Sequence, residues 1–496
     1  MKQLKVATLR TFRHATHHWE TVVVARAAAK PSLVLAIVCT GVVLSSLDLF
    51  IVNVALPSIA RDLRTGSLGG VTWVLNAYAI VFAALLVLAG RLADRSGQKP
   101  AFLLGVAVFT AASAACAAST SLSMLVAFRV VQAAGAAVLV PTSLALVLAA
   151  YPPERRGGAV RTWTAMGGAA AAVGPVVGGL LVAQSWRWIF LVNLPIGIGA
   201  LIVGARRLPD VRGDRGPWPD AAGAALLTAA ITGLTFALLQ GNAWGWSSWR
   251  VTGLFAAAML AGTAFFWRSA RHPRPILDLD LLRTRSFAVA TFATLLFSTA
   301  FGAMLLAAML WTQDVWHWSA LRAGLSLVPG PLMVPLWSAA AGPLIRRFGP
   351  GRVITLGCTV FAAGLMWLAA AIGLQPHYVS EMLGGTLLTG IGVGLTLPTL
   401  YSTAAAALPP ERFATGSAVV SMVRQIGFAL GVATLVAVLG SPTSAHGQLS
   451  AFEQAWVVIS VLSLAAAGTG FLLRTQHSRP EVNRSATPAT REAARP

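Results

Sequence analysis

About fourteen apolar runs recur along this chain of 496 residues, and each is long enough to cross a lipid bilayer. Only 11% of the residues are charged, against roughly 25% in a typical soluble chain, so too little polar surface is present for a water-soluble protein. Because lipid cannot satisfy open backbone groups, such runs are expected to be helices. The sequence therefore predicts an all-α membrane protein. The predicted spans are residues 33–58, 70–90, 100–119, 122–150, 158–183, 187–205, 221–240, 251–267, 286–311, 322–345, 353–374, 382–407, 415–440 and 452–473.

Lysine and arginine set the predicted orientation. With the N-terminus inside, thirty of the 37 Lys and Arg residues fall on the cytoplasmic side of the spans and five fall outside. This excess follows the positive-inside rule and predicts that both termini are cytoplasmic. It also accounts for the net charge of +21 without a nucleic-acid partner. The arginine-rich, alanine-rich composition is typical of a high-GC bacterium. With the apolar spans, it predicts a multi-pass protein of the cytoplasmic membrane of such a bacterium.

An internal repeat divides the chain into two related parts. Gly135–Arg155 aligns without gaps on Gly392–Arg412, with nine of 21 positions identical. A weaker pair relates the segment from Gly90 to the segment from Gly342. The repeat maps span 4 onto span 12, so both halves run the same way through the membrane. Two parallel six-helix halves around a central path, with spans 7 and 8 as an inserted hairpin, form the major facilitator fold, which works by alternating access.

The repeat and the loop compositions give a predicted domain organisation. The basic N-terminal segment is interpreted as a cytoplasmic tail, because the apolar run after it is too long for a signal peptide and lacks a small-residue cleavage site. The predicted divisions are a tail over 1–32, an N-terminal half over 33–208, a linker with the inserted hairpin over 209–268, a C-terminal half over 269–473 and a disordered cytoplasmic tail over 474–496.

Five motifs lie in order on the predicted spans. They are LDLFIVNVALP (Leu47–Pro57), GRLADRSGQK (Gly90–Lys99), RVVQ (Arg129–Gln132), GPVVGG (Gly174–Gly179) and WRWIFLVNLPIG (Trp186–Gly197). Together they resemble the fourteen-span drug:proton antiporters of the major facilitator superfamily, over about residues 33 to 473. The resemblance implies proton-coupled export of drug-like small molecules or antibiotics, conferring resistance, with the proton gradient as driving force, no cofactor and no required protein partner.

The chain departs from this family pattern at three points. Ala133 replaces the glycine that usually follows the glutamine of the fourth-span motif, and Ala170 stands where a glycine is common in the fifth span. The second copy of the loop motif has Arg346 where the first has Asp94. Only the first copy is therefore expected to act as a full charge motif.

Asp48 is the one acidic residue that falls deep within a predicted span, and ionisable groups inside a membrane are functional candidates by default. At 1.5 Å per residue, Asp48 lies about 22 Å from the inner start of span 1, and Arg129 about 10 Å from the outer start of span 4. In a core of about 30 Å their depths are similar. We expect Asp48 to carry the coupled proton and Arg129 to tune it. The alternative is a static ion pair that locks the two spans together.

The loop motif comprises Gly90, Arg91, Asp94, Arg95, Gly97 and Lys99. Asp94 is expected at the inner surface, where a carboxylate favours the positive N-terminal end of a helix. By resemblance, that helix is the start of span 13, near Phe413 to Ser417, so the contact would hold an inside gate shut. The alternative is local helix capping combined with the positive-inside topology.

The antiporter motif comprises Gly174, Pro175, Gly178 and Gly179. Small residues permit close helix contact, and proline permits a bend. The resemblance links this motif to exchange rather than co-transport. Ordinary small-residue packing, which would serve either direction, is the alternative.

Eight further side chains are candidates for a substrate cavity between the halves. They are Asn53, Asn76, Tyr78, Gln132, Trp163, Tyr401, Arg424 and Gln425. Any of them can instead join neighbouring helices. Arg424 has no acidic residue at similar depth nearby in the sequence, so it either meets an anionic substrate group or makes structural hydrogen bonds.

Competing functions remain open at this point. Cys39, Cys116 and Cys358 lie in apolar stretches with no metal or disulfide spacing, and no nucleophile–base pair or phosphate loop indicates an enzyme. A receptor or sensor would not need the twofold repeat. Within transporters, the alternatives are a narrow-substrate exporter of an endogenous metabolite or a self-made antibiotic, and an uptake symporter.

Overall fold

The computed structural model describes residues 30–65, 68–211, 219–273, 275–408, 413–440, 442 and 444–473. All regular structure in these residues is helical, and 14 helices are long and apolar enough to cross a membrane. Each predicted span corresponds to one of them, which confirms the prediction of an all-α membrane protein. The predicted tails lie largely outside the described residues, and the cytoplasmic placement of the termini stays a prediction, as do the domain boundaries.

The N-terminal half is built from six crossing helices and two short ones. They are α2 (Pro31–Asp62), α3 (Leu68–Val71), α4 (Trp73–Ser96), α5 (Gln98–Ala117), α6 (Leu122–Ala150), α7 (Pro153–Val182), α8 (Trp188–Leu191) and α9 (Asn193–Arg207). The long helices α2 and α4 have more buried residues than α9 because they lie against the other half, whereas α9 packs on α5 and α2.

The C-terminal half repeats this plan. Its elements are α12 (Leu279–Arg283), α13 (Arg285–Leu310) with the π-helical turn η1 (Trp311–Val315), α14 (Ala320–Ser326), α15 (Pro329–Phe348), α16 (Pro350–Ala371), η2 (Val379–Leu383), α17 (Gly384–Ala406), α18 (Phe413–Leu439), α19 (Ala445–Thr469) and η4 (Gly470–Leu472). The π-helical turns extend α13 and precede α17, and both lie at the predicted outer ends of their spans.

Equivalent glycines make the repeat visible in the packing. Gly135 of α6 lies so close to α5 that an added Cβ would be 2.7 Å from the backbone nitrogen of Phe109. Gly392 of α17 stands in the same relation to α16, where an added Cβ would be 2.7 Å from the backbone nitrogen of Phe361. These two glycines are aligned in the sequence repeat. The internal duplication therefore specifies the same close helix pair in both halves.

The inserted hairpin lies over a seam between the halves. It consists of α10 (Ala221–Trp244) and α11 (Trp249–Ser269), and α10 packs on both α4 and α18. Asp220, which is buried at the start of α10, accepts a 2.6 Å hydrogen bond from Arg268 near the end of α11. α11 is largely exposed, as expected for a helix that faces lipid on most of its surface.

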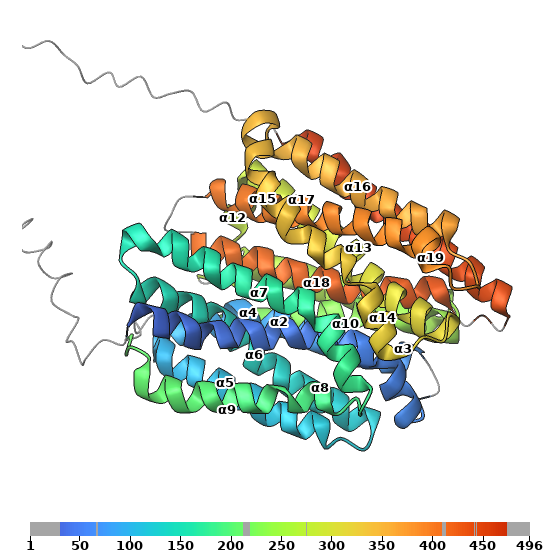
Figure 1. Ribbon diagram of the computed structural model, residues 1–496. Helices are drawn as coiled ribbons and strands as arrows, with labels where there is room; N and C mark the ends of the chain where they lie inside the picture. Colours follow the sequence, from blue (N-terminus) through green and yellow to red (C-terminus); the bar gives the residue numbers. More distant parts are fainter. Residues whose placement is uncertain are drawn as a thin grey trace, which may run out of the picture.

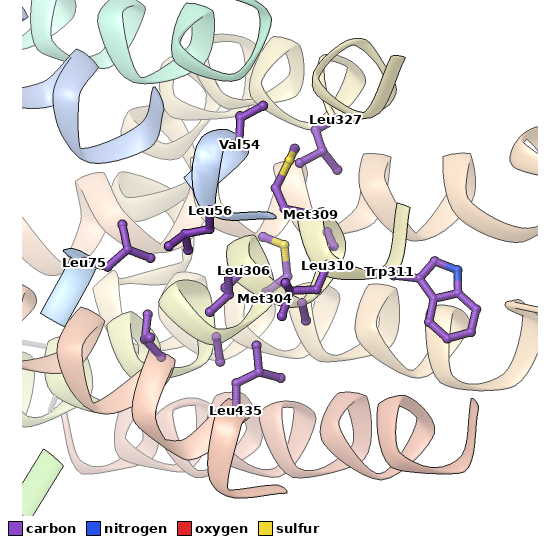
Figure 2. Packing of buried hydrophobic residues seen from close by; sticks show 14 of the residues in the cluster. Val54, Leu56, Leu75, Met304, Leu306, Met309, Leu310, Trp311, Leu327 and Leu435 are labelled. Atoms are coloured by element: carbon purple, nitrogen blue, oxygen red, sulfur yellow. The ribbon is translucent and has the colours of Figure 1, made fainter. Parts of the chain in front are cut away.

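The two halves meet most closely at one end of the molecule. Figure 1 shows that α7 and α15 approach each other where α14 lies and spread apart toward the opposite end. The contact of α7 with α14 is more extensive than its contact with α15. Gln313 of η1 donates a 3.0 Å hydrogen bond from Nε2 to the backbone oxygen of Val54 in α2. Apolar side chains fill the same region, and Figure 2 shows Val54, Leu56 and Leu75 of one half beside Met304, Met309, Leu327 and Leu435 of the other. Because the halves are packed together at this end, and this end is the predicted outer side, the structure is closed toward the outside.

Candidate functional site

Asp48 and Arg129 form an ion pair inside the N-terminal half. Arg129 Nη1 lies 2.5 Å from Asp48 Oδ2, and neither side chain has any exposed surface. The sequence prediction that α2 and α6 bring these residues to the same depth is therefore matched by their positions.

A polar network surrounds the pair. Gln132, one helical turn after Arg129, donates from Nε2 to Asp48 Oδ1 (2.8 Å) and to Ser113 Oγ (2.9 Å). Its Oε1 accepts from Arg129 Nη1 at 2.7 Å. Asn193 of α9 adds a longer bond of 3.3 Å to Ser113 Oγ. Both carboxylate oxygens of Asp48 are thus hydrogen-bonded, which offsets the cost of burying its charge.

Backbone and ring groups hold Arg129 in place. Its Nε donates to the backbone oxygen of Val74 in α4 at 3.0 Å. The Tyr78 ring lies 4.1 Å from the guanidinium carbon, and the Phe190 ring lies 5.8 Å from it. Rings at such distances stabilise a cation through their π faces. The arginine therefore ties α4 to α6, and the carboxylate ties α2 to α6.

A small hollow lies between the halves, beside this cluster. It is lined by α2, α4, α13 and α18, with Asn53 and Asn76 as its polar residues among those described. A second, adjoining hollow shares Phe50, Asn53 and Leu305 and extends toward Pro175 of α7. Leu49, the neighbour of Asp48, lines the first hollow. The ion pair and the inter-half space therefore share α2 and α4.

The other predicted cavity residues lie elsewhere. Tyr78 and Gln132 belong to the buried cluster around Arg129. Trp163 of α7 donates from Nε1 to Ser143 Oγ of α6 at 3.0 Å and so joins two helices of one half. Tyr401 of α17 and Arg424 of α18 lie near each other, with the guanidinium carbon 5.9 Å from the ring centre, and the neighbouring Gln425 is buried. None of these six residues lines either hollow.

The loop motif forms a tight turn between α4 and α5. Gly97 has a φ of 100°, which favours glycine, and it links the end of α4 to the start of α5. Asp94 accepts a 2.7 Å hydrogen bond from Gln98 Nε2, and Lys99 pairs with Asp210 at 3.2 Å. Gly90 lies against Pro141 of α6. The expected contact of Asp94 with the start of span 13 stays a prediction, since residues 409–412 lie outside the described residues.

The antiporter motif packs on both halves. Added Cβ atoms at Gly174 and Gly178 would lie 2.9 Å from Phe50 and Ile51 of α2. An added Cβ at Gly179 would lie 2.7 Å from the Cα of Leu321 in α14, across the boundary between the halves. An added Cβ at Gly324 of α14 would lie even closer to the backbone oxygen of Pro175. These small residues allow the two halves to pack together at the predicted outer side.

Two groups of residues in this region were not predicted from the sequence. Gln313 has no sequence signal because it lies in a π-helical turn, whose register the apolar pattern does not reveal. Phe50, Phe301 and Phe428 form a cluster of rings between the halves, with Phe301 and Phe428 centred 5.7 Å apart. An aromatic residue in an apolar span gives no sequence signal of its own.

Comparison with known families identifies the chain. The model of the Major Facilitator Superfamily matches residues 38–432, and a second match covers residues 336–495. The chain belongs to the Major Facilitator Superfamily. The predicted family is thereby confirmed, and this member is a transporter with a membrane setting and small-molecule substrates.

Several curated members of the superfamily are similar in sequence. The tetracenomycin C resistance and export protein of Streptomyces glaucescens is 34% identical over 417 residues, which cover 83% of this chain and 76% of that protein. The multidrug resistance protein Stp of Mycobacterium tuberculosis is 35% identical, covering 82% of this chain and 75% of its own length. The probable actinorhodin transporter of Streptomyces coelicolor is 32% identical, with coverage of 81% and 71%.

Two solved transporter structures share the fold. A crystal structure of the POT family transporter PepTSo has a TM-score of 0.65 at 15% identity, and the match covers 88% of this chain and 97% of that one. The human organic anion transporter MFSD10 has a TM-score of 0.59 at 17% identity, with coverage of 89% and 99%. At such identities the likeness concerns the fold alone.

Proposed function

We propose that this protein exports drug-like small molecules or antibiotics across the cell membrane of a high-GC bacterium in exchange for protons. Similar members of the superfamily are named for antibiotic resistance, export and multidrug resistance. The observation that carries the coupling mechanism is the buried Asp48–Arg129 pair, which is held by Gln132 beside the space between the halves. No cofactor is needed, since the proton gradient supplies the free energy.

Asp48 is the proposed proton carrier. A proton on its carboxylate removes the negative charge that compensates Arg129 and weakens the bonds that join α2 to α6. Leu49 and Asn53 on α2 line the hollow between the halves, so a shift of α2 changes the space offered to a substrate. Binding of a proton and binding of a substrate would thus favour different arrangements of the same helix.

The conformation described here fits an inward-facing state of this cycle. The predicted outer side is closed by the contact between Gly179 and Leu321 and by the bond from Gln313 to Val54. Proton loading from outside and release inside then require the halves to rock about the central path.

The test is transport by purified protein in liposomes under an imposed pH gradient. Asp48→Asn keeps the shape of the side chain but cannot exchange a proton, so we expect gradient-driven transport to be lost while substrate binding persists. Asp62→Asn is the matched control, because Asp62 pairs with Arg187 at the protein surface. Gradient-driven transport at the wild-type rate in Asp48→Asn would refute the proposed coupling.

A narrow-substrate exporter is the second candidate. The tetracenomycin C and actinorhodin proteins are each named for one compound. A resistance panel of antibiotics and dyes, measured in cells with and without the gene, separates the two candidates. Protection against chemically unrelated compounds supports multidrug export, and protection against a single class supports the narrow exporter.

A further inference from the structure

The inserted hairpin packs on both halves at the predicted outer side. α10 lies on α4 of the N-terminal half and on α18 of the C-terminal half, and these two helices also pack on each other. Leu239 of α10 forms a small apolar cluster with Ala433 and Val436 of α18. Leu68 and Trp73 of the N-terminal half pack against this cluster. Helices from the hairpin and from both halves therefore meet at one seam.

The attachment of α10 to α18 includes a directional bond. Asn242, near the end of α10, donates a 2.8 Å hydrogen bond from Nδ2 to the backbone oxygen of Ala437. This oxygen lies in the last turn of α18, where backbone carbonyls have no partner within their own helix. Asn242 Oδ1 accepts a 3.1 Å hydrogen bond from Trp246 Nε1, so both ends of the amide are held. α10 is thereby fixed at one height on the C-terminal half.

The attachment of α10 to the N-terminal half is made by apolar contacts. The rings of Phe236 and Trp73 have centres 5.8 Å apart, and Trp244 packs edge-on against Phe236 at 5.5 Å. Gly69 of α3 lies against Leu239, where an added Cβ would be 3.3 Å from the backbone oxygen of Leu239. Lipid chains are as apolar as these side chains, so lipid can replace such contacts when helices move apart.

We propose that the inserted hairpin is a strap that holds the predicted outer side closed. In this structure α10 bridges the seam between α3 and α4 on one side and α18 on the other. When the halves rock apart at this end, α10 stays with α18 and releases Trp73 and Gly69. The inference rests on the alternating-access cycle of the proposed function, because a strap has a role only if this end opens.

Removing one side chain of the strap should make opening easier. Phe236→Ala deletes the ring that packs on Trp73. Because paired rings stabilise their contact beyond the area they bury, we expect opening to become about fivefold more favourable. The measure is the rate at which a maleimide labels a cysteine introduced at Leu327, a buried residue that lines the second hollow. Phe266→Ala is the matched control, since Phe266 belongs to the same hairpin but is 52% exposed.

A disulfide tests which half α10 follows. In Gly69→Cys/Leu239→Cys the new Cβ at position 69 would lie 4.0 Å from the Cβ of residue 239, a separation that a disulfide spans. The disulfide would tie α10 to the N-terminal half as well as to α18. We therefore expect labelling of the Leu327→Cys site to fall about tenfold on oxidation and to recover on reduction. Peptide mass spectrometry reads the label at position 327 separately from the other cysteines.

The pair Ala230→Cys/Gly262→Cys is the control for this disulfide. These residues lie on α10 and α11, and an added Cβ at Gly262 would lie 3.9 Å from the Cβ of Ala230. The control disulfide links the two helices of the hairpin to each other and joins neither to a half. Labelling of the Leu327→Cys site should therefore be the same in the oxidised and reduced protein.

The outcomes decide between a strap and an insertion that only fills lipid-facing surface. Equal labelling in Phe236→Ala and Phe266→Ala overturns the inference, as does labelling that the disulfide between positions 69 and 239 does not slow. If that cysteine pair does not fold, the comparison of Phe236→Ala with Phe266→Ala decides alone. Export driven by the pH gradient would uphold the proposed function in each case. A strap that slows opening in a protein without gradient-driven export would overturn the proposed function alone.

Discussion

Arg129 and Asp48 are in contact at 2.5 Å although 81 residues separate them in the chain, and both are fully buried. A pair of this kind makes α2 and α6 depend on one another electrostatically. Each charge is tolerated in the interior only because the other is present. The pair therefore has a consequence for stability as well as for coupling.

Breaking the pair from one side should be costly. In Arg129→Met the Asp48 carboxylate stays buried without its counter-charge, and we expect a loss of about 3–5 kcal/mol in stability. The double variant Asp48→Leu/Arg129→Met removes both charges and should recover most of that loss. Thermal unfolding followed by tryptophan fluorescence in lipid nanodiscs measures both effects.

The control for this prediction is the surface pair. Arg187 and Asp62 are partly exposed, and Arg187→Met should cost no more than about 1 kcal/mol. Losses that simply add in the double variant of the buried pair would contradict the idea that Asp48 and Arg129 stabilise each other.

Gln313 is expected to stabilise the state in which the halves are closed at the predicted outer side. Its bond to the backbone oxygen of Val54 joins the two halves, and a neutral hydrogen bond contributes about 1 kcal/mol. Gln313→Leu should therefore raise the open-to-closed ratio about fivefold. Maleimide labelling of a cysteine introduced at Leu327, a buried residue that lines the second hollow, reports this opening.

Two features make the labelling experiment selective. The native cysteines Cys39, Cys116 and Cys358 are all buried, so background labelling should be low. Thr312→Val is the matched control, since Thr312 bonds only carbonyls of its own helix. Labelling that is unchanged or slower in Gln313→Leu would show that this hydrogen bond does not hold the outer side closed.

Much of the fold follows from the sequence because lipid imposes one simple rule. Every spanning segment must be a long apolar helix, so the spans could be located from hydropathy and the halves from the repeat. The depths of Asp48 and Arg129 follow from a constant rise per residue. These are properties of single helices, and a sequence contains them.

Features that depend on how helices meet could not be predicted in this way. The list of candidate cavity residues did not separate Asn76 from Trp163, because a partner for an amide or indole is set by the rotation of neighbouring helices. The partner of Gly179 in α14 was equally hidden, since α14 is a short helix at the start of a predicted span. Tertiary packing supplies this information.

Gly179 should control the closure of the predicted outer side. A methyl group at this position would lie 2.7 Å from the Cα of Leu321 and would force α7 and α14 apart. Gly179→Ala should therefore favour the outer-open state and raise the labelling of a cysteine at Leu327 by roughly tenfold, which corresponds to about 1.4 kcal/mol. Gly168→Ala on the same helix is the control, because its added methyl group meets no atom within 4 Å. Since alanine is also the better helix former, both variants gain intrinsic helix stability, and a difference in labelling between them isolates the contact with α14. Equal labelling of the two variants would mean that the glycine contact does not limit opening.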